Sequence, residues 1–317
     1  MAKQSGLGSR FLTGGYDISG DVQALDSIAA TTGMQDGTDV TQYGHARIPL
    51  ARDGSMGFTV FFDTANAHPV LSALPTADQQ MMALLPVLAV GSPAAVLNAK
   101  QIGYDATRGT DGSLTLKVAG LGNAYGLEWG KQVTPGVRAD TTATNGTSLD
   151  NAAATAWGAQ MYLQVTAFTG TSVTVTVQQS ADNSTWITLG SAFTAVTSAP
   201  ATQRLTTAAA LAFTATNASP CVFTVTGSAP ANGTVYTLSG TVPTGFTAGT
   251  VYYVVSSSGS TFELSATSGG SAINSSSTGT GTATPAVLRY LRAISAGTFT
   301  VASFAVVVNR NLAATVF

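Results

Sequence analysis

Apolar side chains alternate with small polar ones along most of the 317-residue chain, a period typical of strands with one buried face. In residues 45–63, two alternating runs flank Arg52-Asp53-Gly54-Ser55, and the Asp-Gly pair predicts a tight hairpin turn. A second hairpin is predicted over residues 95–120, with its turn at residues 108–112. A further strand follows at residues 125–133.

Prolines delimit the only predicted helix, residues 68–75, with Pro69 in its first turn and Pro75 at its end. The segment that follows allows two interpretations. Residues 76–79 fit a capping box that would begin a helix, whereas Pro86 would soon interrupt that helix. Both helix and strand therefore stay open for residues 79–91.

Beyond residue 150 the pattern predicts strands alone. Residues 161–165 and 172–177 alternate, and residues 290–294 and 299–308 do so again, with a turn expected at Gly297. Short strands separated by turns every 8–12 residues are typical of a sandwich or a barrel. The predicted fold class is mainly β, with one short helix.

Charge divides the chain into parts of different character. Residues 1–150 hold nine basic and 13 acidic side chains, a net charge of −4, and the remainder carries +2. Residues 141–154 show no period and are predicted to be a linker. Residues 207–286 carry one charge, Glu263, and have their own strand pattern at residues 222–226, 235–239, 250–255 and 261–265.

We therefore predict three domains. The first spans residues 1–147. The second is assembled from residues 148–206 and 287–317. A small β domain, residues 207–286, is inserted into a loop of the second.

Composition excludes several classes of protein. Charged residues make up 9% of the chain and the net charge is −2, which argues against a generally basic nucleic-acid binder. The single cysteine, Cys221, excludes an intramolecular disulfide and is expected to be buried and inert. Residues 1–6 contain no apolar core, so no secretory signal is expected, and the longest apolar run, residues 81–90, is too short for membrane insertion.

The residue types that carry enzyme chemistry are sparse. His45 and His68 share no helix face, and the two glutamates, Glu128 and Glu263, fall in different predicted domains. Nucleophile elbows and phosphate-binding loops do not occur in the sequence. We predict no enzymatic activity and no catalytic, cofactor-binding or metal-binding residue. Residues 36–39 could hold calcium, but a plain turn is favoured.

Aromatic side chains leave one binding function open. Trp157, Trp186 and Tyr252 could stack on sugars or could pack in cores, and core packing is the more common fate.

Several runs in the first 150 residues resemble the major tail protein, or tail tube protein, of siphophages. The runs are MAKQSGLG at 1–8, GGYDISGD at 14–21, AHPVLSALPTAD at 67–78, AKQI at 99–102, RGTDGSLT at 108–115 and GLEWG at 126–130.

This resemblance implies a β-sandwich with a flanking helix, and it favours a strand at residues 79–91. It also implies a structural virion protein, made in the bacterial host cytoplasm, whose hexameric rings stack into the DNA-ejection channel of a non-contractile tail. The implied partners are other copies of the chain, the tape-measure, tail-terminator and distal tail proteins, and phage DNA in transit without tight binding.

Later segments resemble other tail components. Residues 157–205 and 288–311 are similar to the accessory β-sandwich often fused behind the tube domain. The insert is similar to a small repeat of phage tail and fibre proteins, on Leu238, PTG at 243–245, AGTVYYVV at 248–255, FELSA at 262–266 and GG at 269–270. Both would decorate the tube. The alternative is a host-surface adhesin that binds glycans through these outer domains.

Two further expectations concern assembly. Residues 1–20 are rich in glycine and are expected to form a poorly ordered arm, so that a subunit lacking residues 1–15 would still fold. Six copies of the first 150 residues carry a net charge of −24, which predicts an acidic or neutral channel with most arginines at subunit contacts.

Overall fold

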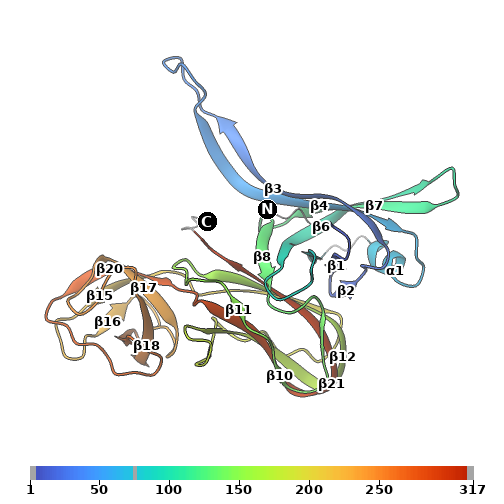
Figure 1. The fold of residues 1–317 in the computed structure, drawn as a ribbon. Coiled ribbons are helices and arrows are strands. Elements are labelled where there is room, and N and C mark those ends of the chain that lie inside the picture. The colour runs from blue at the N-terminus through green and yellow to red at the C-terminus, as the bar shows by residue number, and fades with distance from the viewer. Residues whose placement is uncertain (1–4, 74–76, 313–317) are drawn as a thin grey trace.

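The computed structural model describes residues 5–73 and 77–312, and these form two sheet systems, a 15-stranded sheet and a closed barrel (Figure 1). Within those ranges the only helix is α1 (Ala67–Leu71). The mainly β fold class with one short helix is therefore confirmed.

The N-terminal part of the large sheet is built around one long strand, β6. Its first half pairs with β5 and β8, and its second half pairs with β7, which leads on to β4 and β3. The two halves thus belong to two layers that enclose a common apolar core. The strands of this part are β1 (Arg10–Thr13), β2 (Tyr16–Asp17), β3 (Val22–Asp36), β4 (Arg47–Phe61), β5 (Gln79–Leu84), β6 (Pro93–Arg108), β7 (Leu114–Gly122) and β8 (Glu128–Gln132).

Helix α1 covers one end of this core. Ala67 and Leu71 are buried in it, beside Phe58 and Leu97. The predicted helix is confirmed over residues 68–71. Residues 72 and 73 form a turn instead, and Leu74 and Pro75 lie outside the described residues. The strand interpretation of residues 79–91 is also confirmed for β5, which pairs with β1 on one edge and β6 on the other.

The predicted hairpin turn at residues 52–55 is wrong, because β4 runs straight through it. β3 pairs with β4 along its length, and the chain reverses at residues 37–46 instead. Gly54 does not form a turn. It allows the backbone of Leu127 to pack against β4, because a Cβ at residue 54 would lie 2.4 Å from the Leu127 backbone nitrogen. The hairpin between β6 and β7 is confirmed, with its turn where it was predicted.

The N-terminal segment is more ordered than expected. β1 pairs with β5, and Phe11, Leu12 and Ile18 are buried. The expectation that this segment is poorly ordered is therefore wrong for the described residues. Removal of residues 1–15 would take the buried side chains of Phe11 and Leu12 with it, so we now expect the truncated subunit to be destabilised.

The second part of the large sheet is built on two very long strands, β12 and β21, which pair over almost their full length. Register shifts near Thr166, Gly170 and Phe299 bend this ribbon, so its two halves pack against the same core. Gly297, expected in a turn, lies inside β21, where a Cβ would meet the Ser172 carbonyl oxygen at 2.3 Å. The strands are β9 (Arg138–Asp140), β10 (Thr144–Asn145), β11 (Leu149–Asp150), β12 (Ala159–Ser180), β13 (Ile187–Thr188), β14 (Ala201–Thr206) and β21 (Tyr290–Arg310).

The predicted linker is not a free connection. Within residues 141–154, β10 and β11 both pair with β21 and extend the second part of the sheet. β8 pairs with β6 and also with β21, so hydrogen bonding continues from the N-terminal part into the second part. A segment without apolar period can still supply edge strands, because their hydrogen bonds need only backbone atoms.

The third part is a closed barrel of six strands in the order β15-β16-β19-β18-β17-β20 (Figure 1, orange). Its aromatic core includes Phe213, Phe223, Phe246 and Phe262. The first and last strands pair with each other, which brings the entry and exit of the chain together. The strands are β15 (Leu211–Ala215), β16 (Phe223–Val225), β17 (Val235–Thr241), β18 (Val251–Ser258), β19 (Thr261–Ser265) and β20 (Gly279–Pro285).

Candidate assembly interface

The β3–β4 ribbon projects far beyond the body of the molecule (Figure 1, blue). From Ser55 onward, β4 pairs with both β3 and β7. Over residues 47–54, β4 pairs with β3 alone among the described strands. We call residues 30–54, which form the outer part of this ribbon, the arm. An isolated two-stranded hairpin is at best marginally stable in water, so a second surface is needed to hold the arm in one conformation.

Large apolar side chains of the arm are exposed to solvent. Ile48 and Leu50 point to the same face by strand alternation and are 52% and 51% exposed. Met34 pairs with Pro49, so it lies on the opposite face, and it is also exposed. Val40 and Tyr43 are fully exposed near the tip. Both faces of the arm can therefore bury apolar surface against another chain.

Short hydrogen bonds shape the tip. Asp36 accepts hydrogen bonds from the backbone and hydroxyl of Thr38, and its other carboxylate oxygen lies 2.9 Å from Nδ1 of His45. The bonds from Thr38 are the main reason why the pKa of Asp36 is lowered. Asp39 accepts a 2.8 Å bond from the backbone of Thr41.

This arrangement is a turn closed by its own side chains. Across residues 5–73 and 77–312 no group of three or more His, Cys, Asp or Glu side chains is placed to hold a metal ion.

The other residues considered for chemistry occupy structural positions. The ring of His68 lies 2.7 Å from the Tyr104 hydroxyl and packs on Phe62. Cys221 is fully buried, and burial raises the pKa of its thiol. Glu128 pairs with Arg204 at 3.2 Å.

A buried polar junction joins the N-terminal part to the second part. The side chain of Gln164 accepts a 3.0 Å bond from the backbone of Gly15 and donates a 2.7 Å bond to the Gln80 carbonyl oxygen. Gln80 donates in turn to the carbonyl oxygen of Gln203. A mixed apolar cluster surrounds these bonds, with Leu12, Met82 and Val96 from one part and Tyr162, Ala305 and Val307 from the other. The two parts therefore behave as one frame.

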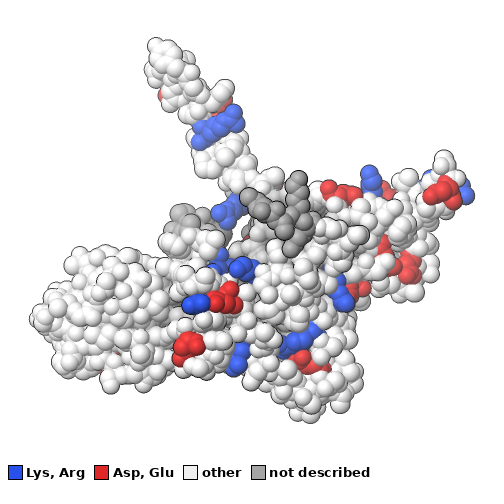
Figure 2. Space-filling model, viewed as in Figure 1, with Lys and Arg blue, Asp and Glu red and all other residues white. Residues whose placement is uncertain are grey.

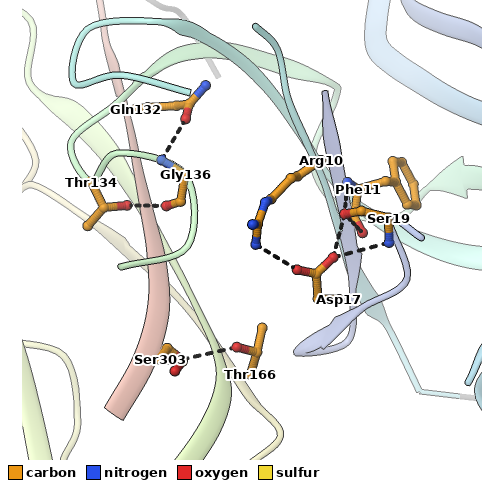
Figure 3. Close-up of polar contacts among 9 residues, drawn as sticks. All are labelled: Arg10, Phe11, Asp17, Ser19, Gln132, Thr134, Gly136, Thr166 and Ser303. Atoms are coloured by element: carbon orange, nitrogen blue, oxygen red, sulfur yellow. Dashed lines mark hydrogen bonds and ion pairs between the residues drawn. The ribbon is translucent and has the colours of Figure 1, made fainter. Parts of the chain in front are cut away.

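Further hydrogen bonds fix the chain segments on either side of this junction (Figure 3). Asp17 accepts bonds from Arg10 and from the backbone of Ser19, which closes the β1–β2 turn. Gln132 accepts from the backbone of Gly136 and orders the loop after β8. These contacts orient β1 and β8, and β8 pairs directly with β21 of the second part.

The three aromatic residues singled out for sugar stacking have different environments. Tyr252 is buried in the barrel core, and its hydroxyl accepts a bond from the backbone of Thr247. The ring of Trp186 is covered by the guanidinium of Arg292 at 4.2 Å. Trp157 is 40% exposed and lines a cleft.

Charges are distributed unevenly over the surface. The visible face of the barrel carries almost none, whereas basic and acidic side chains lie on the arm, around the junction and on the β6–β7 hairpin (Figure 2). Arg47 and Arg52 belong to the arm.

Sequence reasoning missed the arm. The alternation of Ile48 and Leu50 was visible, but the part of β3 beyond Ile28 consists mainly of alanine, threonine and small polar residues without a strong apolar period. The available signal was the absence of any other turn between the start of β3 and residue 37.

No protein-family model matches the chain, and no curated protein matches its sequence. Among the described residues, no helix has the length and apolar character needed to cross a membrane.

Proposed function

We propose that this chain is the tube subunit of a long non-contractile phage tail, and that it polymerises as stacked rings, hexameric as the sequence resemblance implies. The barrel and the sheet built on β12 and β21 would decorate the tube, and the N-terminal part would form the channel. The observation that carries the proposal is the arm, a two-stranded ribbon with apolar side chains exposed on both faces.

The geometry of the arm supports an open or ring-forming assembly. The arm extends away from the body of its own chain (Figure 1). Along residues 30–53, its strands form backbone pairs only with each other. A projecting segment that docks on a different surface of the next copy makes a head-to-tail contact, and such contacts generate rings or filaments. The rigid junction through Gln164 holds the base of the arm and the decorating parts in one frame.

Electron microscopy of the purified protein tests the proposal. Rings or tubes are expected from the native chain. The double variant Ile48→Ser, Leu50→Ser should stay folded and lose them, because it removes the apolar face of the arm. The matched control is Val301→Ser, which changes a partly exposed apolar side chain on β21 and should polymerise normally. Monomers from the native chain at high concentration would contradict the proposal.

Charge on the N-terminal part supports a channel through which DNA slides. On the solvent face of its sheet, Lys117 pairs across the strands with Asp105 and Thr59, and Asp26 accepts a hydrogen bond from Thr59. Around Lys117, two acids thus accompany one base.

DNA binding by purified tubes tests this expectation about the charge of the channel. They should not retain duplex DNA at about 0.15 M salt, because no excess of cations is present to replace DNA counterions. Tight binding that weakens steeply with salt would contradict this part of the proposal.

A further inference from the structure

A cleft of about 770 Å³ lies where the three parts of the molecule meet. Tyr125 contributes from the loop before β8, and Trp157 and Gln160 contribute from the start of β12 and the segment before it. The connections to the barrel, including residues 207–210 and Pro285, form the opposite wall. Its volume is in the range of small-ligand sites.

Two aromatic side chains are exposed at this cleft. Trp157 is 40% exposed and Tyr125 is 44% exposed, and both line the cleft. Exposed aromatic faces at a concave site are the feature that distinguishes a stacking platform from a core residue.

The backbone on either side of Trp157 is fixed by hydrogen bonds. The side chain of Asn311 donates a 2.7 Å bond to the Trp157 carbonyl oxygen, and the backbone of Gly158 donates to the Pro285 carbonyl oxygen. A Cβ at Gly158 would lie 2.2 Å from the Thr207 hydroxyl, so only glycine lets the chain pass there. A ligand would therefore not have to order the backbone that carries Trp157.

The guanidinium of Arg204 supports the second platform. It lies 3.7 Å from the centre of the Tyr125 ring, and it donates to the Tyr162 hydroxyl at 3.0 Å and to Glu128 at 3.2 Å. Burial alone would lower the pKa of Arg204, but Tyr162 and Glu128 outweigh it, so the pKa is raised and the charge is permanent.

The charge in the cleft is already compensated. Among the described residues, Arg204 is the only charged residue that lines the cleft, and it is paired with Glu128 at 3.2 Å. The remaining polar groups are threonine hydroxyls and the amides of Gln160 and Asn311. Such a site suits a neutral ligand with apolar C–H faces and many hydroxyl groups, because a carboxylate or a phosphate would find no uncommitted cation.

We propose that this cleft binds a neutral oligosaccharide, with sugar rings stacked on Trp157 and Tyr125 and hydroxyls bonded to the surrounding amides and threonines. The inference does not depend on polymerisation, and it would hold for a monomer or for a subunit within a tube.

Titration of the full chain with defined oligosaccharides tests the proposal, by saturation-transfer NMR and by tryptophan fluorescence. The probes are maltohexaose, laminarihexaose, chitohexaose and an α-mannohexaose, with a hexamer of galacturonate as the anionic comparison. At least one neutral probe should bind. Trp157→Ala should weaken that binding by at least about tenfold, as for a central aromatic anchor, and Trp157→Phe should keep most of it.

The control is Trp129→Ala, which removes another exposed tryptophan, 47% exposed and outside the cleft, and should leave binding unchanged. Ala209→Trp fills the cleft from the exposed connection to the barrel and should abolish binding without touching either platform. This second variant decides the matter if Trp157→Ala fails to fold.

Three results would overturn the proposal. The first is that no neutral probe binds at about 10 mM, above the millimolar range of weak specific sites. The second is that binding is unaffected by both Trp157→Ala and Ala209→Trp. The third is that galacturonate binds more tightly than every neutral probe.

Discussion

The arm and the barrel solve the problem of strand edges in opposite ways. The barrel closes six strands on themselves and buries its aromatic side chains, so it exposes no unpaired edge between its first and last strand. The arm has two strands, an edge on either side and apolar side chains in water. The barrel has the fewest charges, yet its strands and apolar side chains are paired and buried within the barrel itself. The arm is the part whose strand edges and apolar side chains need another surface to cover them.

Removal of the arm should have the largest effect on assembly. Replacing residues 32–52 by Asn-Gly joins Thr31 to Asp53, which face each other in the ribbon, through a two-residue turn. No residue of the deleted segment belongs to the core of the N-terminal part. We expect complete loss of rings and tubes, by sedimentation velocity and electron microscopy, with a melting temperature within a few degrees of the native value.

The matched deletion removes the barrel. Joining Thr206 to Val287 through a short Gly-Ser linker should leave tubes intact and reduce their outer diameter in projection. Tubes of unchanged diameter, or an insoluble product, would show that the barrel is not a self-contained unit.

Within the barrel, Phe223→Ala should have the largest effect on stability. Phe223 packs against Phe213, Phe246 and Phe262, so truncation leaves a cavity that costs about 3–5 kcal/mol. Hydrogen exchange should accelerate in β15–β20 and stay unchanged in β12 and β21. Equal acceleration in both regions would mean that the barrel and the frame unfold together.

The junction between the N-terminal and second parts should show an intermediate effect. Gln164→Ala leaves a buried amide at Gly15 and a buried carbonyl at Gln80 without this partner, at a cost of about 1–3 kcal/mol in urea denaturation. Gln35→Ala on the arm is the control, because Gln35 is exposed and its loss should change the free energy of unfolding by less than about 0.5 kcal/mol.

The smallest expected effect is a pH dependence from the exposed pair Asp150–Arg289. Hydrogen bonds from Arg289 lower the pKa of Asp150 from 3.8 to about 2. A carboxylate with a lowered pKa stabilises the fold above the unfolded value and loses that contribution as the pH falls from 4 to 2. Asp150→Asn should therefore lower the melting temperature slightly at pH 7 and make it less sensitive to pH in that range. An unchanged pH profile would show that the pair contributes nothing.

Sequence patterns predicted the elements whose apolar faces are buried locally. The β6–β7 hairpin and the central barrel strands have alternating large side chains that reach a core within the same part of the molecule. The pattern left β5 open between helix and strand, because its residues do not alternate, and only the resemblance favoured a strand. The edge strands β10 and β11 could not be predicted, because they are held by backbone bonds to β21, more than 130 residues away.

Glycines caused the two wrong turns for a shared reason. Gly54 and Gly297 both lie inside strands, where they allow another backbone to approach closely. Sequence alone does not distinguish this use of glycine from a turn, since both require the absence of a Cβ.

The candidate cleft was also beyond sequence reasoning. Trp157 was named as one of three possible sugar platforms, but Tyr125 and Arg204 come from other parts of the chain and meet it only in the folded molecule.

The closed barrel also has a consequence for how the chain reaches its native state. β12 and β21 are separated by more than 100 residues of intervening chain, and long-range pairing of this kind is slow because the loop must close first. The paired strands β15 and β20 hold the two ends of the barrel together. If the barrel folds early, the loop that must close between β12 and β21 is reduced to the segments that connect these strands to the barrel. The folded barrel would then hold the two longest strands close together and favour their pairing.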